Sequence, residues 1–209
     1  MVRRFFYVEI LHRQWHVDKI PRPKAEKKLP VVLSCDEVKR IFAEVSDFKH
    51  RMILMTIYSG GLRVSETANL KVSDIDSSRM QIRVDQGKGK KDRYTLLSER
   101  LLKDLRRYYM IYRPGEWLFP GRVDDKPISV STIQNAFKQA KQRAGIRKPA
   151  TVHTLRHSFA THLLESGTDI LTIQRLLGHS SLKTTKIYIH IQSKYLEKVV
   201  NPLDRMAQV

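Results

Sequence analysis

The apolar run HRMILMTIYSGG, at residues 50–61, restricts the possible folds more than any other part of the chain. Its apolar side chains lie almost all the way round a helical projection, a pattern typical of a helix that is buried on every side. Gly60 and Gly61 mark its expected end, because glycine readily adopts the left-handed conformation that closes many helices. The sequence therefore predicts a buried core helix in this region.

Further helices are expected on both sides of this run. Ser34, with Glu37 three residues later, forms a capping box ahead of regularly spaced apolar positions, which predicts a helix start. VSETANL, at residues 64–70, continues the helical pattern after the glycines. The pattern returns from Ser98 onward. The segments concerned are residues 98–112, 131–145, 151–167, 168–179 and 193–200.

Two short segments alternate between polar and apolar residues instead. MQIRVDQ (80–86) and RYTLLS (93–98) are rich in β-forming residues and are joined by the lysine-glycine run GKGKKD, which predicts a β-hairpin with a basic loop. VSDID, at residues 72–76, is a candidate third strand. The expected fold class is mainly α with a small antiparallel β-sheet.

The charge of the chain points to a polyanionic partner. Its 39 lysines and arginines outnumber 21 aspartates and glutamates, a formal net charge of +18, and the basic residues are spread through the folded segments. Such an imbalance favours nucleic acid as the partner, without separating DNA from RNA.

The same composition bears on location and redox chemistry. No stretch approaches the roughly 18 consecutive apolar residues that cross a bilayer, and the first residues lack signal-peptide features, so we expect a soluble, intracellular protein with no membrane partner. The single cysteine, Cys35, excludes an intramolecular disulfide and a cysteine-rich zinc site. We interpret it as a buried or incidental residue at a helix start.

Residues 151–167 raise a choice between a metal and a phosphate. His153, Arg156, His157 and Ala160 share one face at helical spacing, and the predicted buried face holds Leu155, Phe159 and Leu163. A zinc site of the H-E-x-x-H type needs a glutamate where Thr154 stands, and Arg156 would repel the cation. Because Thr151 and the positive helix N-terminus favour an anion, we predict a phosphate and no metal or other cofactor.

Basic or nucleophilic groups elsewhere match that prediction. Arg63 follows the glycine pair, with Glu66 three residues later to anchor or orient it, and Lys88 lies at the expected hairpin tip. His179 follows a helix-ending glycine, and Tyr188 lies nine residues further on. Each motif alone has an ordinary structural explanation. Together they fit the attack of a phenolate on a phosphodiester.

At this point the sequence closely resembles the tyrosine recombinase family, also called phage-type integrases, which includes the Xer and integron recombinases. The resemblance runs from about Leu33 to Pro202 and is carried by GLRVSE, GKGKKDR, HTLRHSFATHLLESG, LLGHSSLKTT and KIYIH in the family's order. It implies the catalytic-domain fold of that family and a site-specific recombinase that cleaves and rejoins DNA through a 3′-phosphotyrosyl intermediate.

The resemblance also implies a role for each site residue. Arg63 and Arg156 would bind the phosphate, Lys88 would be the hairpin lysine, and Tyr188 the nucleophile. His153 and His179 would occupy the family's two histidine positions, and we expect His153 to assist the proton loss from tyrosine and Lys88 to protonate the departing 5′-oxygen.

Domain organisation and assembly follow from the same resemblance. Residues 1–30 are expected to be the remnant of an N-terminal core-binding helix plus linker, and residues 31–209 the catalytic domain with a C-terminal helix. The implied partners are double-stranded DNA and further copies of the chain, in a tetrameric synapse held through that helix. We expect a cytoplasmic, nucleoid-associated protein of a bacterium or archaeon.

Two other functions remain open at this point. A type IB topoisomerase-like enzyme would relax supercoiled DNA irrespective of sequence, and a DNA-binding regulator would bind without covalent trapping. The short spacing from His179 to Tyr188 favours the recombinase.

Overall fold

The fold is seen in a computed structural model, which describes residues 9–10, 12, 30–85, 92–122, 126–179, 181 and 185. Its helices are α2 (Cys35–Ala43), α3 (Phe48–Gly60), α4 (Val64–Ala68), α5 (Glu99–Tyr112), α6 (Val130–Arg143), α7 (Val152–Glu165) and α8 (Ile170–Leu177). The strands are β1 (Ile75–Asp76), β2 (Gln81–Val84) and β3 (Arg93–Leu96), with the 3-10 turn η3 (Val72–Asp74) before β1. The predicted fold class, mainly α with a small antiparallel sheet, is confirmed.

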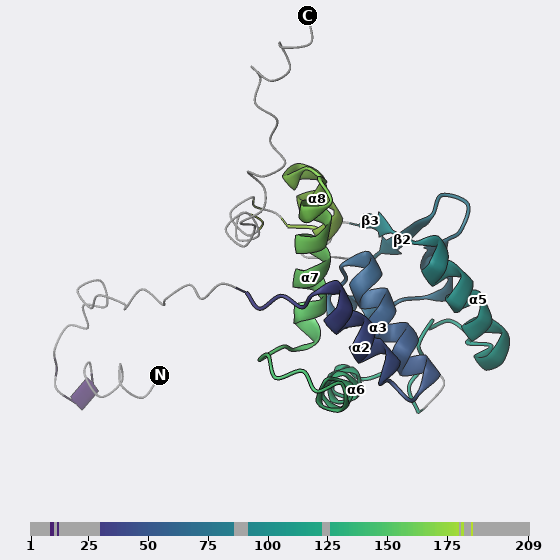
Figure 1. Ribbon diagram of the computed structural model, residues 1–209, viewed down its shortest axis with the longest axis horizontal. Helices are drawn as coiled ribbons and strands as arrows, with labels where there is room; N and C mark the ends of the chain where they lie inside the picture. Colours follow the sequence, from purple (N-terminus) through teal and green to yellow (C-terminus); the bar gives the residue numbers. More distant parts are fainter. Residues whose placement is uncertain are drawn as a thin grey trace, which may run out of the picture.

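Helix α3 is the core helix that the apolar run predicts. It packs against α2, α4, α5, α6, α7 and β3, and Figure 1 shows it in the middle of the helical body. Met52, Ile53, Leu54 and Ile57 are each at most 1% exposed. The helix ends at Gly61, whose φ of 58° is left-handed, as the glycine pair predicts.

Helix α2 begins where the capping box predicts. The Ser34 hydroxyl accepts a hydrogen bond from the Glu37 backbone N–H, and the Glu37 carboxylate accepts one from the Ser34 N–H. Cys35 is the first helical residue, but it is exposed, so it is not a buried cysteine. Its Sγ lies 3.7 Å from Nδ1 of His162.

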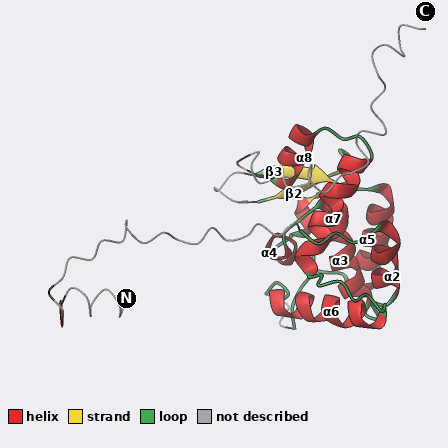
Figure 2. Ribbon diagram, turned by 60° about the vertical axis from the view of Figure 1, so that its left-hand side comes forward, coloured by secondary structure: helices red, strands yellow, loops and turns green. Residues whose placement is uncertain are grey.

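The three strands form one antiparallel sheet in the order β1-β2-β3, which confirms the predicted hairpin pairing. The candidate third strand at 72–76 is a strand only at Ile75–Asp76, because Val72–Asp74 form the turn η3. Ile82 pairs with Thr95, and both are buried. The Thr95 hydroxyl donates to the Gly60 carbonyl at 2.8 Å, which fastens the sheet to the end of α3. Figure 2 shows β2 and β3 beside the end of the molecule where α8 lies, with α6 at the opposite end.

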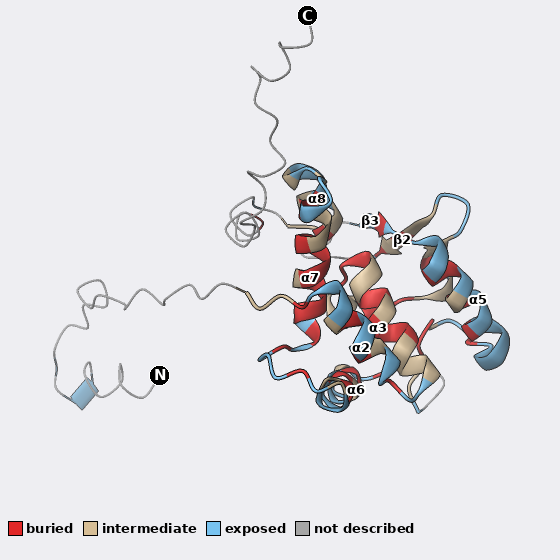
Figure 3. Cartoon of the chain, viewed as in Figure 1, coloured by how far each residue is buried: buried red, intermediate tan, exposed pale blue. Residues whose placement is uncertain are grey.

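Helices α7 and α8 share a second, smaller core. Phe159, Ala160 and Leu164 of α7 pack with Ile173 and Leu177 of α8. Helix α7 is buried over most of its surface, as Figure 3 shows, whereas much of α5 faces outward. The predicted division of α7 into a polar and a buried face is therefore wrong, because Arg156 and Ala160 are as buried as Leu155, and Leu163 is only half-buried.

Several predicted features lie outside the described residues. They are most of the proposed remnant at 1–30, the hairpin loop at 86–91 and the C-terminal helix at 193–200. The division at residue 30 therefore stays a prediction. Within the described ranges, no helix combines the length and the apolar character needed to cross a membrane.

Candidate active site

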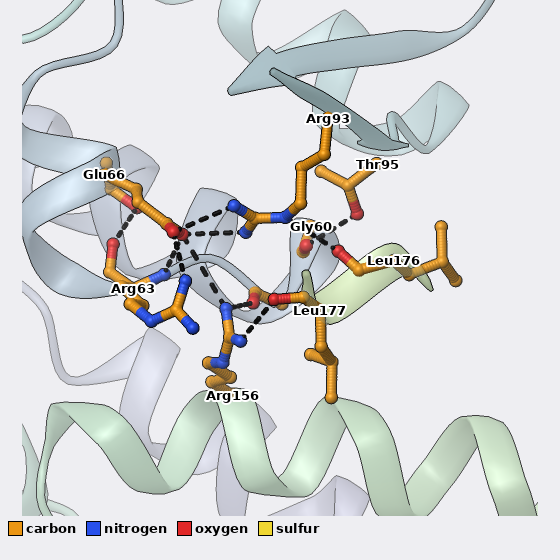
Figure 4. Close-up of polar contacts among 10 residues, drawn as sticks. Gly60, Arg63, Glu66, Arg93, Thr95, Arg156, Leu176 and Leu177 are labelled. Carbon is orange, nitrogen blue, oxygen red and sulfur yellow. Dashed lines mark hydrogen bonds and ion pairs between the residues drawn. The ribbon is translucent and has the colours of Figure 1, made fainter. Parts of the chain in front are cut away.

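The candidate site is built around one carboxylate, that of Glu66 in α4, which three arginines approach (Figure 4). Arg93 donates to both of its oxygens, each at 2.8 Å, in a forked pair. Arg63 donates from its backbone N–H at 2.7 Å and from Nη1 at 2.5 Å. Arg156 Nη1 lies 3.7 Å from Oε2. Three guanidinium charges thus face a single negative charge.

This environment keeps Glu66 ionised. Burial of the side chain, which is 9% exposed, acts to raise its pKa. The hydrogen bonds and charge of Arg93, with the hydrogen bonds from Arg63, outweigh burial and lower the pKa to about 2. The carboxylate is therefore a fixed anion that orders the guanidinium groups around it.

Arg63 is held at the start of α4 with its guanidinium partly open to solvent. The left-handed turn at Gly61 ends α3 and leads the chain to Arg63, the N-cap of α4, where Glu66 closes the cap. The Arg63 side chain is 26% exposed, compared with 10% for Arg93 and 1% for Arg156. Of the three arginines, Arg63 is thus the most accessible to a ligand.

Arg156 lies beneath this surface. Its Nη1 donates to the Gly61 carbonyl at 2.7 Å and its Nη2 to the Leu177 carbonyl at 2.6 Å. These two carbonyls lie at the C-terminal ends of α3 and α8, where backbone acceptors need partners from outside the helix. An arginine that sequence reasoning places on a polar helix face is therefore buried, because it joins two helix ends.

The histidines of α7 separate into two groups. His153 is exposed and its ring meets that of His157 edge to face, with centroids 4.6 Å apart. Partial burial, then the charges of Arg156 and Arg63, lower the pKa of His153. His157 has a pKa of about 4, lowered first by burial and then by His153 and Arg156. His162 instead faces Tyr58, whose hydroxyl lies 2.8 Å from Nδ1, so it takes no part in the cluster.

His179 reaches the cluster from the end of α8. Gly178, with a φ of 64°, closes that helix and turns the chain into His179. Nδ1 of His179 lies 3.0 Å from the Thr185 hydroxyl. Burial and then the charges of Arg156, Arg63, His157 and Arg93 lower its pKa to about 4. The charges of Arg156 and Arg63 therefore lower the pKa of both His153 and His179, which lie 26 residues apart in the sequence.

Four of the six predicted site residues, Arg63, His153, Arg156 and His179, are thus brought to one region. Lys88 and Tyr188 lie outside the described residues. Sequence reasoning missed Arg93, which follows the basic hairpin loop. The sequence did hold a signal for it. Side chains alternate between the two faces of a strand, so in β3 Arg93 lies on the same face as the buried Thr95.

The arrangement is suited to an anion. Guanidinium groups bind phosphate oxygens through paired hydrogen bonds, and the surplus of arginines leaves positive charge that Glu66 does not neutralise. Among the described residues, no three histidine, cysteine, aspartate or glutamate side chains gather closely enough to hold a metal ion.

The chain is similar to known proteins along most of its length. The sequence profile of the phage integrase family matches residues 31–194. A Sinorhizobium fredii protein named integrase/recombinase y4qK is 48% identical over 96% of this chain and 66% of its own length. Tyrosine recombinase XerA of Pyrococcus horikoshii is 38% identical over 88% of this chain and 65% of its own. The chain thus spans about two thirds of the length of these relatives.

Solved structures of recombinases share the fold of this chain. The crystal structure of XerA recombinase superposes with a TM-score of 0.72 and 34% identity, over 92% of this chain and 69% of that one. XerH site-specific recombinase, bound to a palindromic difH substrate in a post-cleavage complex, gives 0.74 and 26% identity over 85% and 54%.

The class of protein that the fold and these comparisons define is the tyrosine recombinases. The chain belongs to the phage integrase family. The comparisons favour neither the topoisomerase nor the regulator alternative, because the relatives and structures are named as recombinases and integrases.

Proposed function

We propose that the protein binds double-stranded DNA and cleaves and rejoins its strands at specific sites through a 3′-phosphotyrosyl intermediate. The observation that carries this proposal is the Glu66 cluster, in which three guanidinium groups share one carboxylate and two positive charges remain in excess. A phosphodiester transition state gathers negative charge on its equatorial oxygens, and such a preorganised positive site stabilises it.

Tyr188 is the proposed nucleophile. Its phenolic oxygen forms a bond to phosphorus while the bond from phosphorus to the 5′-oxygen breaks, so the phosphodiester energy is kept in the protein–DNA bond. His153 accepts the phenolic proton, and its lowered pKa supports this role because the ring is then neutral near pH 7. Lys88 donates a proton to the departing 5′-oxygen. Attack by a 5′-hydroxyl of another strand reverses these steps and rejoins the DNA.

Arg63, Arg156 and His179 are the proposed phosphate ligands. The exposed fraction of Arg63 supports its role directly. Arg156 is 1% exposed, so direct contact requires its guanidinium to be uncovered when DNA binds. If the Thr185 hydroxyl donates to Nδ1 of His179, the ring proton lies on Nε2, which can donate to a phosphate oxygen.

The remaining parts of the proposal concern assembly and location. Recombination joins two DNA sites, and we propose that four copies of the chain form the synapse, held through the C-terminal helix at residues 193–200. XerH, a structural relative, is bound to its substrate DNA. A net charge of +18 supports binding to duplex DNA and a place in the nucleoid of a bacterial or archaeal cell.

The test uses covalent capture. The full chain is incubated with a library of nicked duplexes whose core is randomised, and the DNA that stays attached after denaturation is sequenced. Recovery of a common sequence is expected, and Tyr188→Phe should bind the recovered duplex but form no adduct, because only the attacking oxygen is removed. A normal adduct yield from Tyr188→Phe would show that another residue is the nucleophile.

A further inference from the structure

Arg93 binds protein acceptors through all three of its guanidinium nitrogens. Nη1 and Nη2 donate to the two oxygens of Glu66, and Nε donates to the Leu176 carbonyl at 3.1 Å. The side chain is 10% exposed. All three of its nitrogens thus already have protein acceptors, and its forked pair with Glu66 distinguishes it from Arg156, which approaches that carboxylate with one nitrogen at 3.7 Å.

The forked pair of Arg93 limits what Glu66 can do to Arg63. Arg63 lies three residues from Glu66 on the same turn, and within the described residues its side chain reaches the carboxylate through Nη1 alone. Bidentate pairing is the strongest geometry between arginine and a carboxylate. If Arg93 did not occupy both oxygens, Glu66 would be free to take a second side-chain donor from Arg63.

Arg93 also fixes the end of α8. Its Nε binds the Leu176 carbonyl next to the Leu177 carbonyl that Arg156 binds, so two adjacent carbonyls of this helix end are held by two arginines (Figure 4). A Cβ at Gly178 would lie 2.6 Å from Cδ of Arg93, so the glycine makes room for the side chain. His179 is the next residue along the chain.

From this geometry, and resting on the proposed function, we propose that Arg93 is a positioning residue: by occupying both Glu66 oxygens it limits the Arg63 side chain to one contact with the carboxylate and thereby keeps the remaining Arg63 donors available to the scissile phosphate. It acts through Glu66 and does not touch DNA. The prediction that separates this role from a merely structural one is non-additivity. Loss of Arg93 should slow cleavage when residue 66 is a carboxylate, and have little further effect when residue 66 is an uncharged amide.

The experiment measures single-turnover cleavage of the duplex recovered by covalent capture, at saturating DNA. Arg93→Met should lower the cleavage rate by about ten-fold or more, since small displacements of a positioning group carry losses of this order. Its affinity for the duplex should stay within about three-fold, because the Arg93 side chain is not at the surface. In a Glu66→Gln background, the same change should alter the rate by less than about three-fold.

Arg83→Met is the matched control. Arg83 lies on the neighbouring strand β2 and makes its own two-nitrogen pair with the buried Asp74, through Nε at 3.0 Å and Nη2 at 2.9 Å. Its loss should lower stability by a similar mechanism while leaving cleavage by the folded protein at the wild-type rate. Unfolding of every variant is measured, so that rates are compared where each is folded.

Three outcomes would overturn the proposal. The first is a wild-type cleavage rate for Arg93→Met, and the second is an equal loss of rate from Arg93→Met with glutamate and with glutamine at position 66. The third is an equal loss of cleavage rate for Arg83→Met. If Arg93→Met does not fold, Arg93→Lys replaces it. The lysine keeps the charge but cannot form the fork, so it should slow cleavage with Glu66 and not with Gln. Failure of the proposed function is distinguishable, because the wild-type chain would then capture no duplex.

Discussion

Replacement of Glu66 by glutamine tests whether the buried carboxylate holds the site together. The lowering of its pKa from an ordinary 4.5 to about 2 corresponds to about 3 kcal/mol of stability at neutral pH. Glutamine preserves the shape of the side chain but removes the charge and leaves the arginines without their anion. We therefore expect Glu66→Gln to lower the free energy of unfolding by about 3 kcal/mol near pH 7, a large share of a typical domain's stability.

The pH dependence of this loss has a definite sign. Because the folded-state pKa is below the unfolded one, the stabilisation by Glu66 is fully present above about pH 5 and is lost as the pH falls from there toward 2. The difference between wild type and Glu66→Gln should accordingly shrink with acid. Urea unfolding, followed by circular dichroism at several pH values between about 7 and 3, measures both curves.

The control is Glu44→Gln, the same chemical change at an exposed residue that follows α2. It should alter stability by less than about 0.5 kcal/mol at every pH. Two results would refute the reasoning. One is a Glu66→Gln loss no larger than that of the control, and the other is a loss that stays constant as the pH falls.

Three further expectations use different assays. Gly61→Ala should lower the free energy of unfolding by about 2–5 kcal/mol, because a Cβ there would meet the Phe159 ring at 2.3 Å and the residue has a φ of 58°. The neighbouring Gly60→Ala should change it by less than about 1 kcal/mol, and equal losses would contradict this. Cleavage in excess EDTA should proceed at the rate in buffer alone, and a requirement for added magnesium or zinc would count against electrostatic catalysis by arginine. Deletion from Ser193 onward should weaken the assembly of paired DNA sites while leaving single-site binding intact; unchanged assembly with lower thermal stability would show that this segment packs on its own domain.

Much of the architecture is predictable because its signals are local. The α2 cap depends on Ser34 and Glu37, three residues apart, and the end of α3 depends on two adjacent glycines. Hairpin pairing follows from alternation over short segments. In each case the physical cause lies within one turn or one strand, where the sequence displays it directly.

The site is less predictable because its contacts are not local. Two partners of Arg156 lie 95 and 21 residues away, and both of these are backbone carbonyls, which carry no side-chain signature in the sequence. In β3 the apolar residues are misleading, since Tyr94 and Leu96 are 52% and 43% exposed while the opposite face carries Arg93. Arginine is seldom fully buried unless it is paired, so sequence reasoning places it at the surface.

The anchoring of Arg156 links the assembly of the candidate site to the completion of the fold. Its guanidinium is satisfied only when the ends of α3 and α8 have both closed on α7, and a buried charge without such partners is strongly destabilising. Partly unfolded chains therefore lack the assembled arginine cluster, although they carry every residue that forms it. The cluster around Glu66 is therefore assembled together with the finished fold and not before it.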